Sequence, residues 1–183
     1  MKEILDNVSP FDLPQKSGKI MASAMNAGII TGLVMIAYTL IVNIAGLQYE
    51  QWVQWLGLVP MVGVASFFAI QFRQTIPPTG YLTFGQGFKY LFFSMMICTI
   101  LAIIFYFIYV SFINTDYLMG LLEFTEDKLK EKNLKPEQIK ASMEMTKKFM
   151  TPISSSLIGL IANSILSVIS SLIVGAIIRK EPK

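Results

Sequence analysis

The side chains best placed to do chemistry lie in the last apolar stretch of the chain, where small and polar residues recur at every fourth position. This spacing puts them on one face of a helix. Such a face could line a water-filled path for a neutral solute, with Asn163 near its middle as the most polar point. It could equally pack against a neighbouring helix, because small residues let backbones approach and hydroxyls and amides form hydrogen bonds between helices. Packing is the favoured interpretation. The candidate residues are Ser155, Gly159, Asn163, Ser167, Ser171 and Gly175.

The residues needed for acid-base or nucleophilic catalysis are missing from the apolar stretches. The chain contains no histidine, which removes Ser-His-Asp and Cys-His schemes and the commonest zinc ligand. Its one cysteine, Cys98, lies in apolar surroundings without a base. The pair of glycines in Gly85-Gln86-Gly87 follows no predicted strand, so it indicates a turn rather than a phosphate-binding loop. We therefore expect no enzyme activity, no cofactor and no metal.

Ionisable residues are also absent from the middle of each apolar stretch. A charged side chain at that depth costs at least about 2.5 kcal/mol and usually marks a functional site. Transport coupled to proton relays through carboxylates or histidines is therefore not expected. At the end of the second apolar stretch and the start of the third, Arg73 and Lys89 form a candidate contact for an anionic lipid headgroup.

Four long apolar stretches must position these residues, and they predict an all-α, four-helix transmembrane bundle. Each stretch has about 20 residues or more, which as a helix covers the roughly 30 Å hydrocarbon core. Hydrophobic residues make up 54% of the chain and charged residues 15%, and the net charge of +3 is too small to suggest nucleic acid. The 183 residues predict one integral membrane domain, residues 1–183. The predicted spans are residues 20–46, 53–72, 88–113 and 152–178.

Small residues also recur at every fourth position in two other spans, where they predict faces for close helix packing. Pro60 should kink the second span or mark a local break, because it lacks a backbone donor. Between spans two and three, Pro77-Pro78 and the glycines at 80, 85 and 87 predict a loop lying against the membrane surface. The two packing faces comprise Ala24, Gly28 and Gly32 in span one, and Ser94, Cys98 and Ala102 in span three.

Residues 114–150 carry 14 of the chain's 27 charged residues and predict an extramembrane helical hairpin between spans three and four. Apolar residues recur there at helical spacing in two short segments. Asn133 is a predicted left-handed residue at the end of the first helix, and Pro136 a predicted first-turn residue of the second. The hairpin carries seven acids and seven lysines, so its surface is nearly neutral.

The orientation follows from the lysines and arginines near the spans. Four spans put both termini on one side, and that side would carry all eight lysines and arginines outside the hairpin. The short loop of residues 47–52 on the other side carries none. By the positive-inside rule, both termini are predicted to be cytoplasmic and the hairpin to lie outside.

Several segments together resemble a bacterial membrane-protein family known as domain of unknown function 4199. They are AGIITGLVMI in span one, YLTFGQGFKYLFF before span three, the NTDYLMGLLEF and LKPEQIKASMEMTKKFMTP runs of the hairpin, and the small-residue last span. The resemblance covers nearly the whole chain from about residue 20. It implies four spans with a long loop before the last. We expect the membrane to be the bacterial inner membrane. It implies no activity and no site residue.

Three functional classes follow from the sequence. The least favoured is a membrane enzyme or lipid-handling protein, because histidines and buried carboxylates are missing. The favoured one is a structural or accessory membrane protein that acts by association with other membrane proteins. The alternative is transport or permeation of a small neutral solute along the polar face of span four, in a homo-oligomer because four helices rarely enclose a pore alone. The lipid bilayer is the one partner common to all three.

Overall fold

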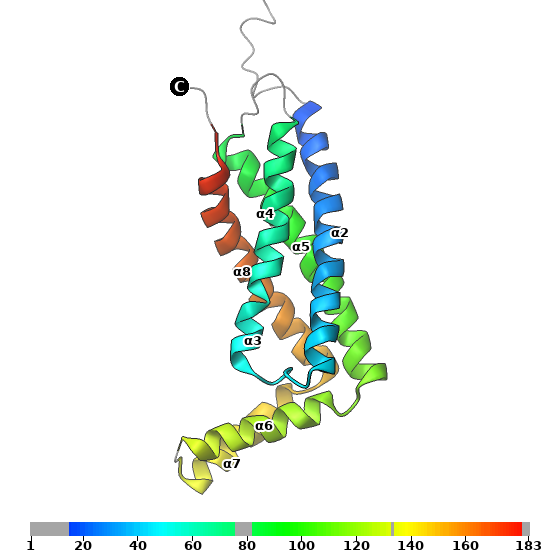
Figure 1. The fold of residues 1–183 in the computed structure, drawn as a ribbon. Coiled ribbons are helices and arrows are strands. Elements are labelled where there is room, and N and C mark those ends of the chain that lie inside the picture. Colours follow the sequence, from blue (N-terminus) through cyan, green and yellow to red (C-terminus); the bar gives the residue numbers. More distant parts are fainter. Residues whose placement is uncertain (1–14, 76–81, 133, 181–183) are drawn as a thin grey trace, which may run out of the picture.

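The computed structural model describes residues 15–75, 82–132 and 134–180, and within them the chain is helical apart from its connections and one isolated backbone bridge. Four helical segments are long and apolar enough to cross a membrane, as predicted. The elements in order are α2 (Gln15–Ile44), α3 (Gln51–Leu56), α4 (Leu58–Gln74), α5 (Phe84–Ile108), the π-helical turn η1 (Tyr109–Ile113), α6 (Tyr117–Glu131), α7 (Pro136–Phe149) and α8 (Pro152–Ile178). Figure 1 shows the bundle with the α6–α7 hairpin lying across one end.

Helix α5 is central and packs against α2, α4 and α8. The predicted small-residue faces of spans one and three meet each other here. A Cβ atom added to Gly28 would lie 2.6 Å from the Ser94 carbonyl oxygen, and one added to Gly32 would lie 2.9 Å from Leu101 Cδ1. The two backbones can therefore approach this closely only because these positions lack side chains.

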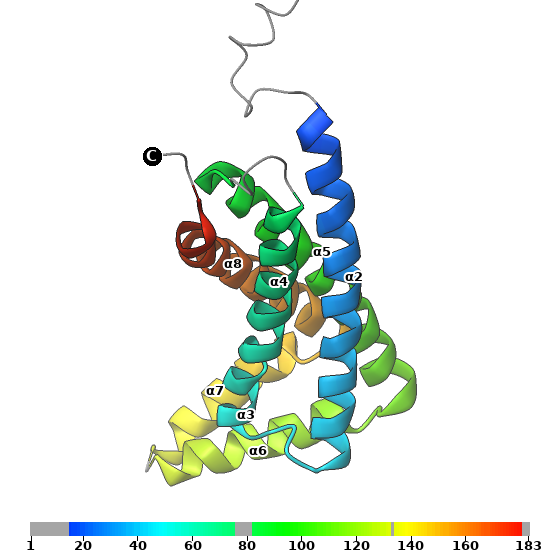
Figure 2. The same cartoon turned by 45° about the horizontal axis from the view of Figure 1, so that its top comes forward.

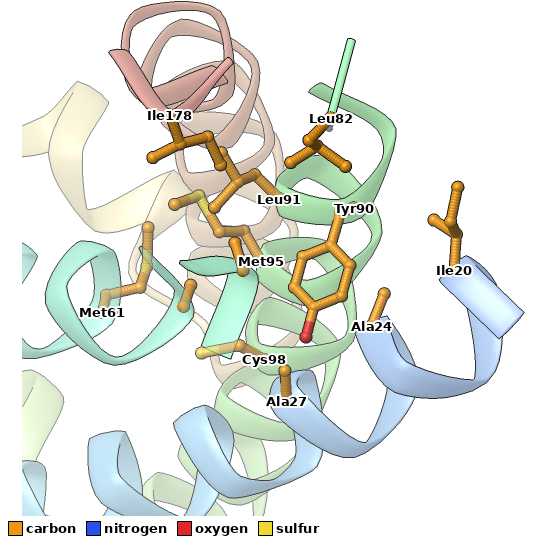
Figure 3. Packing of buried hydrophobic residues seen from close by; sticks show 12 residues of the cluster. Ile20, Ala24, Ala27, Met61, Leu82, Tyr90, Leu91, Met95, Cys98 and Ile178 are labelled. Atoms are coloured by element: carbon orange, nitrogen blue, oxygen red, sulfur yellow. The ribbon is translucent and has the colours of Figure 1, made fainter. Parts of the chain in front are cut away.

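The apolar core fills the half of the bundle nearest the chain termini. Figure 3 shows Tyr90, Met95 and Cys98 of α5 beside Ala24 and Ala27 of α2. The Tyr90 ring stacks on Phe72 of α4, with ring centroids 5.1 Å apart. Side chains from all four spans thus share one core cluster at this end.

The second span is interrupted, as predicted, although the break falls at Gly57, three residues before Pro60. Pro60 lies in the first turn of α4, where a missing backbone N–H costs little. The Tyr38 hydroxyl of α2 donates to the Val53 carbonyl oxygen at 2.6 Å and holds the short helix α3 against the bundle.

The prediction that Gly85-Gln86-Gly87 form part of a loop is wrong, because α5 begins at Phe84. Thr83 and Gln86 form a reciprocal capping box: the Thr83 Oγ1 accepts from the Gln86 N–H, and the Gln86 side chain accepts from the Thr83 N–H. Gly87 lies within the helix, close to Gly175 of α8. The glycines allow a close helix crossing rather than a turn. The part of the predicted loop at residues 76–81 lies outside the described residues.

Two sets of hydrogen bonds join the helices at the termini end. The backbones of Leu82 and Lys180 exchange two hydrogen bonds of 2.9 Å. Arg73 of α4 donates to the carbonyl oxygen of Ile178, the last residue of α8, at 2.9 Å. A cation at this position donates to a carbonyl that has no partner within the helix, and it interacts favourably with the negative end of the helix dipole.

The predicted hairpin is confirmed as α6 and α7, and it runs across the end of the bundle in both views (Figures 1 and 2). Pro136 begins α7, as predicted, whereas Asn133 lies outside the described residues. The hairpin contacts the bundle through aromatic side chains: the Tyr49 ring lies 5.7 Å from that of Tyr117 and 5.9 Å from that of Phe124. Gly120 leaves room for the Tyr49 ring.

Candidate functional site

The half of the bundle nearest the hairpin contains an open cavity of about 910 Å³. Its walls come from all four spans, from α3 and from both hairpin helices. On α5 the lining runs from Cys98 to Tyr106, and on α8 from Ser155 to Asn163. At a rise of about 1.5 Å per residue, the eight steps from the first to the last residue of this α8 segment give a depth of about 12 Å, from the middle of the span to the hairpin.

The cavity wall is apolar with scattered neutral polar groups, and no Asp, Glu, Lys or Arg contributes to it among the described residues. Four methionines line the cavity, and their flexible side chains can adapt to ligands of irregular shape. The apolar lining residues are Met35, Ile36, Met61, Cys98, Ala102, Ile103, Phe105, Leu121, Met145, Phe149, Met150 and Ile158.

Tyr117 contributes to the wall from the hairpin and keeps it neutral. Burial, with a smaller contribution from the nearby tyrosines 106, 49 and 109, raises the pKa of Tyr117. Its hydroxyl therefore stays protonated at physiological pH, and the wall gains no negative charge there.

Several polar side chains of the cavity wall donate a hydrogen bond to their own helix. Thr39 Oγ1 donates to the Met35 carbonyl at 2.9 Å, and Ser155 Oγ to the Thr151 carbonyl at 2.7 Å. The Asn163 amide nitrogen donates to the Gly159 carbonyl at 2.9 Å. Each of these bonds uses one O–H or N–H donor of the side chain and leaves the side-chain oxygen free to accept a hydrogen bond.

Thr99 differs from these three side chains. It is 3% exposed, lies on α5 near the middle of the span, and its hydroxyl has no hydrogen-bond partner among the described residues. A buried hydroxyl without a partner costs about 1–3 kcal/mol. A polar group at the inner end of the cavity would relieve that cost.

The structure divides the six candidate residues of α8 into two groups. Ser155, Gly159 and Asn163 line the cavity. Ser167 and Ser171 are fully buried, and the Ser171 hydroxyl lies 3.8 Å from the Met95 sulfur of α5. A Cβ atom on Gly175 would lie 3.2 Å from the Phe88 backbone nitrogen. The half near the termini therefore packs on α5, and the half near the hairpin faces the cavity.

The two candidate lipid contacts lie at the termini end of the bundle, away from the cavity. The Arg73 guanidinium is partly buried and holds the end of α8, whereas Lys89 is exposed on α5. The structure thus gives Arg73 an intramolecular partner and leaves Lys89 exposed to the surroundings.

The cavity itself was not predicted from the sequence. Thr39, Thr99 and Tyr106 belong to it, and each is a single polar residue in an apolar span, which is a weak signal. Thr99 directly follows Cys98, which belongs to the predicted packing face. This position next to the packing face was the sequence signal that could have indicated that Thr99 is buried.

The bundle and its uncharged cavity define a multi-pass membrane protein with four spans. The chain belongs to the family described as Protein of unknown function (DUF4199), whose match covers residues 26–180 and so includes every span and the hairpin. No curated protein and no solved structure matches the chain.

Proposed function

We propose that the protein is a non-enzymatic membrane protein that holds a neutral, largely apolar molecule in the cavity between its spans and its hairpin. The observation that carries the proposal is the size of the cavity, about 910 Å³, behind a wall without charged residues among those described. Pockets of about 300–1,000 Å³ are typical of sites for small ligands.

Solute transport, the alternative from the sequence, would use the same cavity as its binding site. In a single copy the buried Ser167 and Ser171 close the polar face of α8 beyond Asn163. Passage across the membrane would then need a second conformation or contacts between copies of the chain. Both functions, holding the molecule and transporting it, require that the cavity first binds it.

Filling the cavity should remove the bound molecule. Ala102 lines the cavity from α5, and Ile100 on the same helix is 47% exposed on the bundle surface. We expect wild-type protein purified in mild detergent to release a neutral compound into organic solvent, detected by mass spectrometry. Ala102→Phe should reduce its amount severalfold, because the ring occupies the cavity.

Ile100→Phe is the matched control, since it adds the same ring to the same helix outside the cavity. It should retain the compound at the wild-type amount. Equal amounts of every extracted compound in the two variants would contradict the proposal.

Association with another membrane protein is the second candidate, and an exposed apolar residue on the hairpin favours it. Met119 of α6 is 62% exposed on an element that also carries exposed charges. We expect affinity purification in mild detergent to recover a partner that is lost with Met119→Ser or with deletion of residues 123–148. Glu123→Gln, at an exposed position of the same helix, should keep it. Recovery of the same partner by all variants would exclude the hairpin as the contact.

Cytoplasmic termini, in a bacterial inner membrane, are also part of the proposal, supported by the charges at the two ends. Among the described residues the termini end carries bases and no acids, whereas Glu50 and the balanced hairpin lie at the other end. We expect a fluorescent protein fused after Lys183 to fluoresce, and alkaline phosphatase inserted between α6 and α7 to be active. The reverse pattern would show the opposite orientation. The bases at the termini end are Lys19, Arg73, Lys89, Arg179 and Lys180.

A further inference from the structure

We infer that the cavity selects an uncharged lipophile that carries a hydroxyl group, and this inference rests on the proposed function. The ligand class follows from three features of the wall: its rim, its charge and the direction of its hydrogen bonds.

The rim of the cavity is apolar and exposed. Ile158 of α8 is 50% exposed, and Met145 and Phe149 of α7 are 65% and 51% exposed, while all three also line the cavity. A molecule that passes this rim contacts hydrocarbon side chains first. The ligand therefore has an apolar body, which partitions into the bilayer before it binds.

The wall offers no countercharge to an ionised ligand. Its titratable side chains among the described residues are Cys98, Tyr106 and Tyr117, and a carboxylate or ammonium placed there would lose its hydration without gaining an ion pair. Fatty acids in their ionised form and amines are therefore excluded, and neutral molecules are accepted.

The cavity wall presents both acceptors and donors. Thr39, Ser155 and Asn163 each donate to a carbonyl of their own helix, so their oxygens face new partners only as acceptors. Thr99 carries an unpartnered hydroxyl that can act in either sense, and the Gln54 and Tyr117 side chains add donors to the same wall. A ligand hydroxyl satisfies this arrangement because it can donate to an acceptor and accept from Thr99. An ether or ester oxygen can only accept.

Competition between two isomers tests the inference on the wild-type protein. Decanol and methyl nonyl ether have the same atoms and nearly the same apolar body, but only decanol can donate. Protein in phosphatidylcholine nanodiscs is loaded with tritiated decanol, and the label retained by empty nanodiscs is subtracted. Unlabelled decanol should displace the label at an about three- to tenfold lower concentration than the ether, the effect of one net hydrogen bond. Decanoate at neutral pH should not displace it.

Three outcomes separate the inference from the function on which it rests. Equal displacement by decanol and the ether, with the label absent from Ala102→Phe, would overturn the hydroxyl preference and leave a cavity that binds neutral lipophiles. Displacement by decanoate would overturn the exclusion of charge. Equal retention of label by wild type and Ala102→Phe would overturn the binding function itself.

Discussion

Replacing Gly28 by alanine should destabilise the bundle by about 1–3 kcal/mol, the usual cost of forcing a carbon atom into a packed interior. The added Cβ would lie 2.6 Å from the Ser94 carbonyl oxygen and 2.8 Å from Ile97 Cβ. The first of these is a backbone atom of α5, so no side-chain rotation can relieve the overlap. Helices α2 and α5 must instead move apart along the face that Gly28 and Gly32 share.

Cys98 supplies the measurement. It is the only cysteine of the chain and is 1% exposed, so its reaction with a thiol dye reports loss of the core during heating in detergent. Gly28→Ala should lower the temperature at which Cys98 reacts.

Gly63→Ala is the matched control, because a Cβ atom at Gly63 of α4 meets nothing within 4 Å. It should leave the transition unchanged or raise it slightly, since alanine favours a helix over glycine by up to about 1 kcal/mol. Equal transitions for the two variants would show that α2 and α5 do not pack as described.

Ser155→Cys should react with a water-soluble maleimide. Ser171→Cys should remain unreacted over the time in which Ser155→Cys reacts completely. Both are introduced in a Cys98→Ala background. Ser155 lines the cavity at its hairpin end and is partly exposed, whereas Ser171 is fully buried against Met95 of α5. A buried thiol reacts only through local opening of the structure.

Ser167→Cys should behave like Ser171→Cys, because Ser167 is also fully buried. Reaction at all three positions would restore a continuous polar path along α8 and favour the transport alternative. Protection at all three would show that water does not reach the cavity from the hairpin side.

The spans and the hairpin could be predicted from the sequence because hydrophobicity over about 20 residues depends on the bilayer and not on tertiary contacts. The packing face of Gly28 and Gly32 could be predicted for a similar reason: spacing by four fixes a helix face whatever it contacts. The sequence did not show which of Ser155 and Ser171 faces a cavity. That difference depends on where α8 separates from its neighbours, and residue spacing carries no information about it.

Two further differences arise from tertiary context. Gly85 and Gly87 have low helix propensity, which predicted a loop, but the capping box of Thr83 and the close approach of Gly175 outweigh that propensity. The cavity combines residues from seven helices, and no local pattern relates Thr39 to Thr99 or to Met145.

The bonds of Arg73 to Ile178 and of Leu82 to Lys180 have a mechanical consequence. They fix the end of α8 that is farthest from the cavity. A helix of 27 residues is about 40 Å long, so each degree of tilt about the fixed end moves Pro152 by about 0.7 Å. A given tilt of α8 would therefore change the width of the cavity more than it would change the distance between Gly175 and α5.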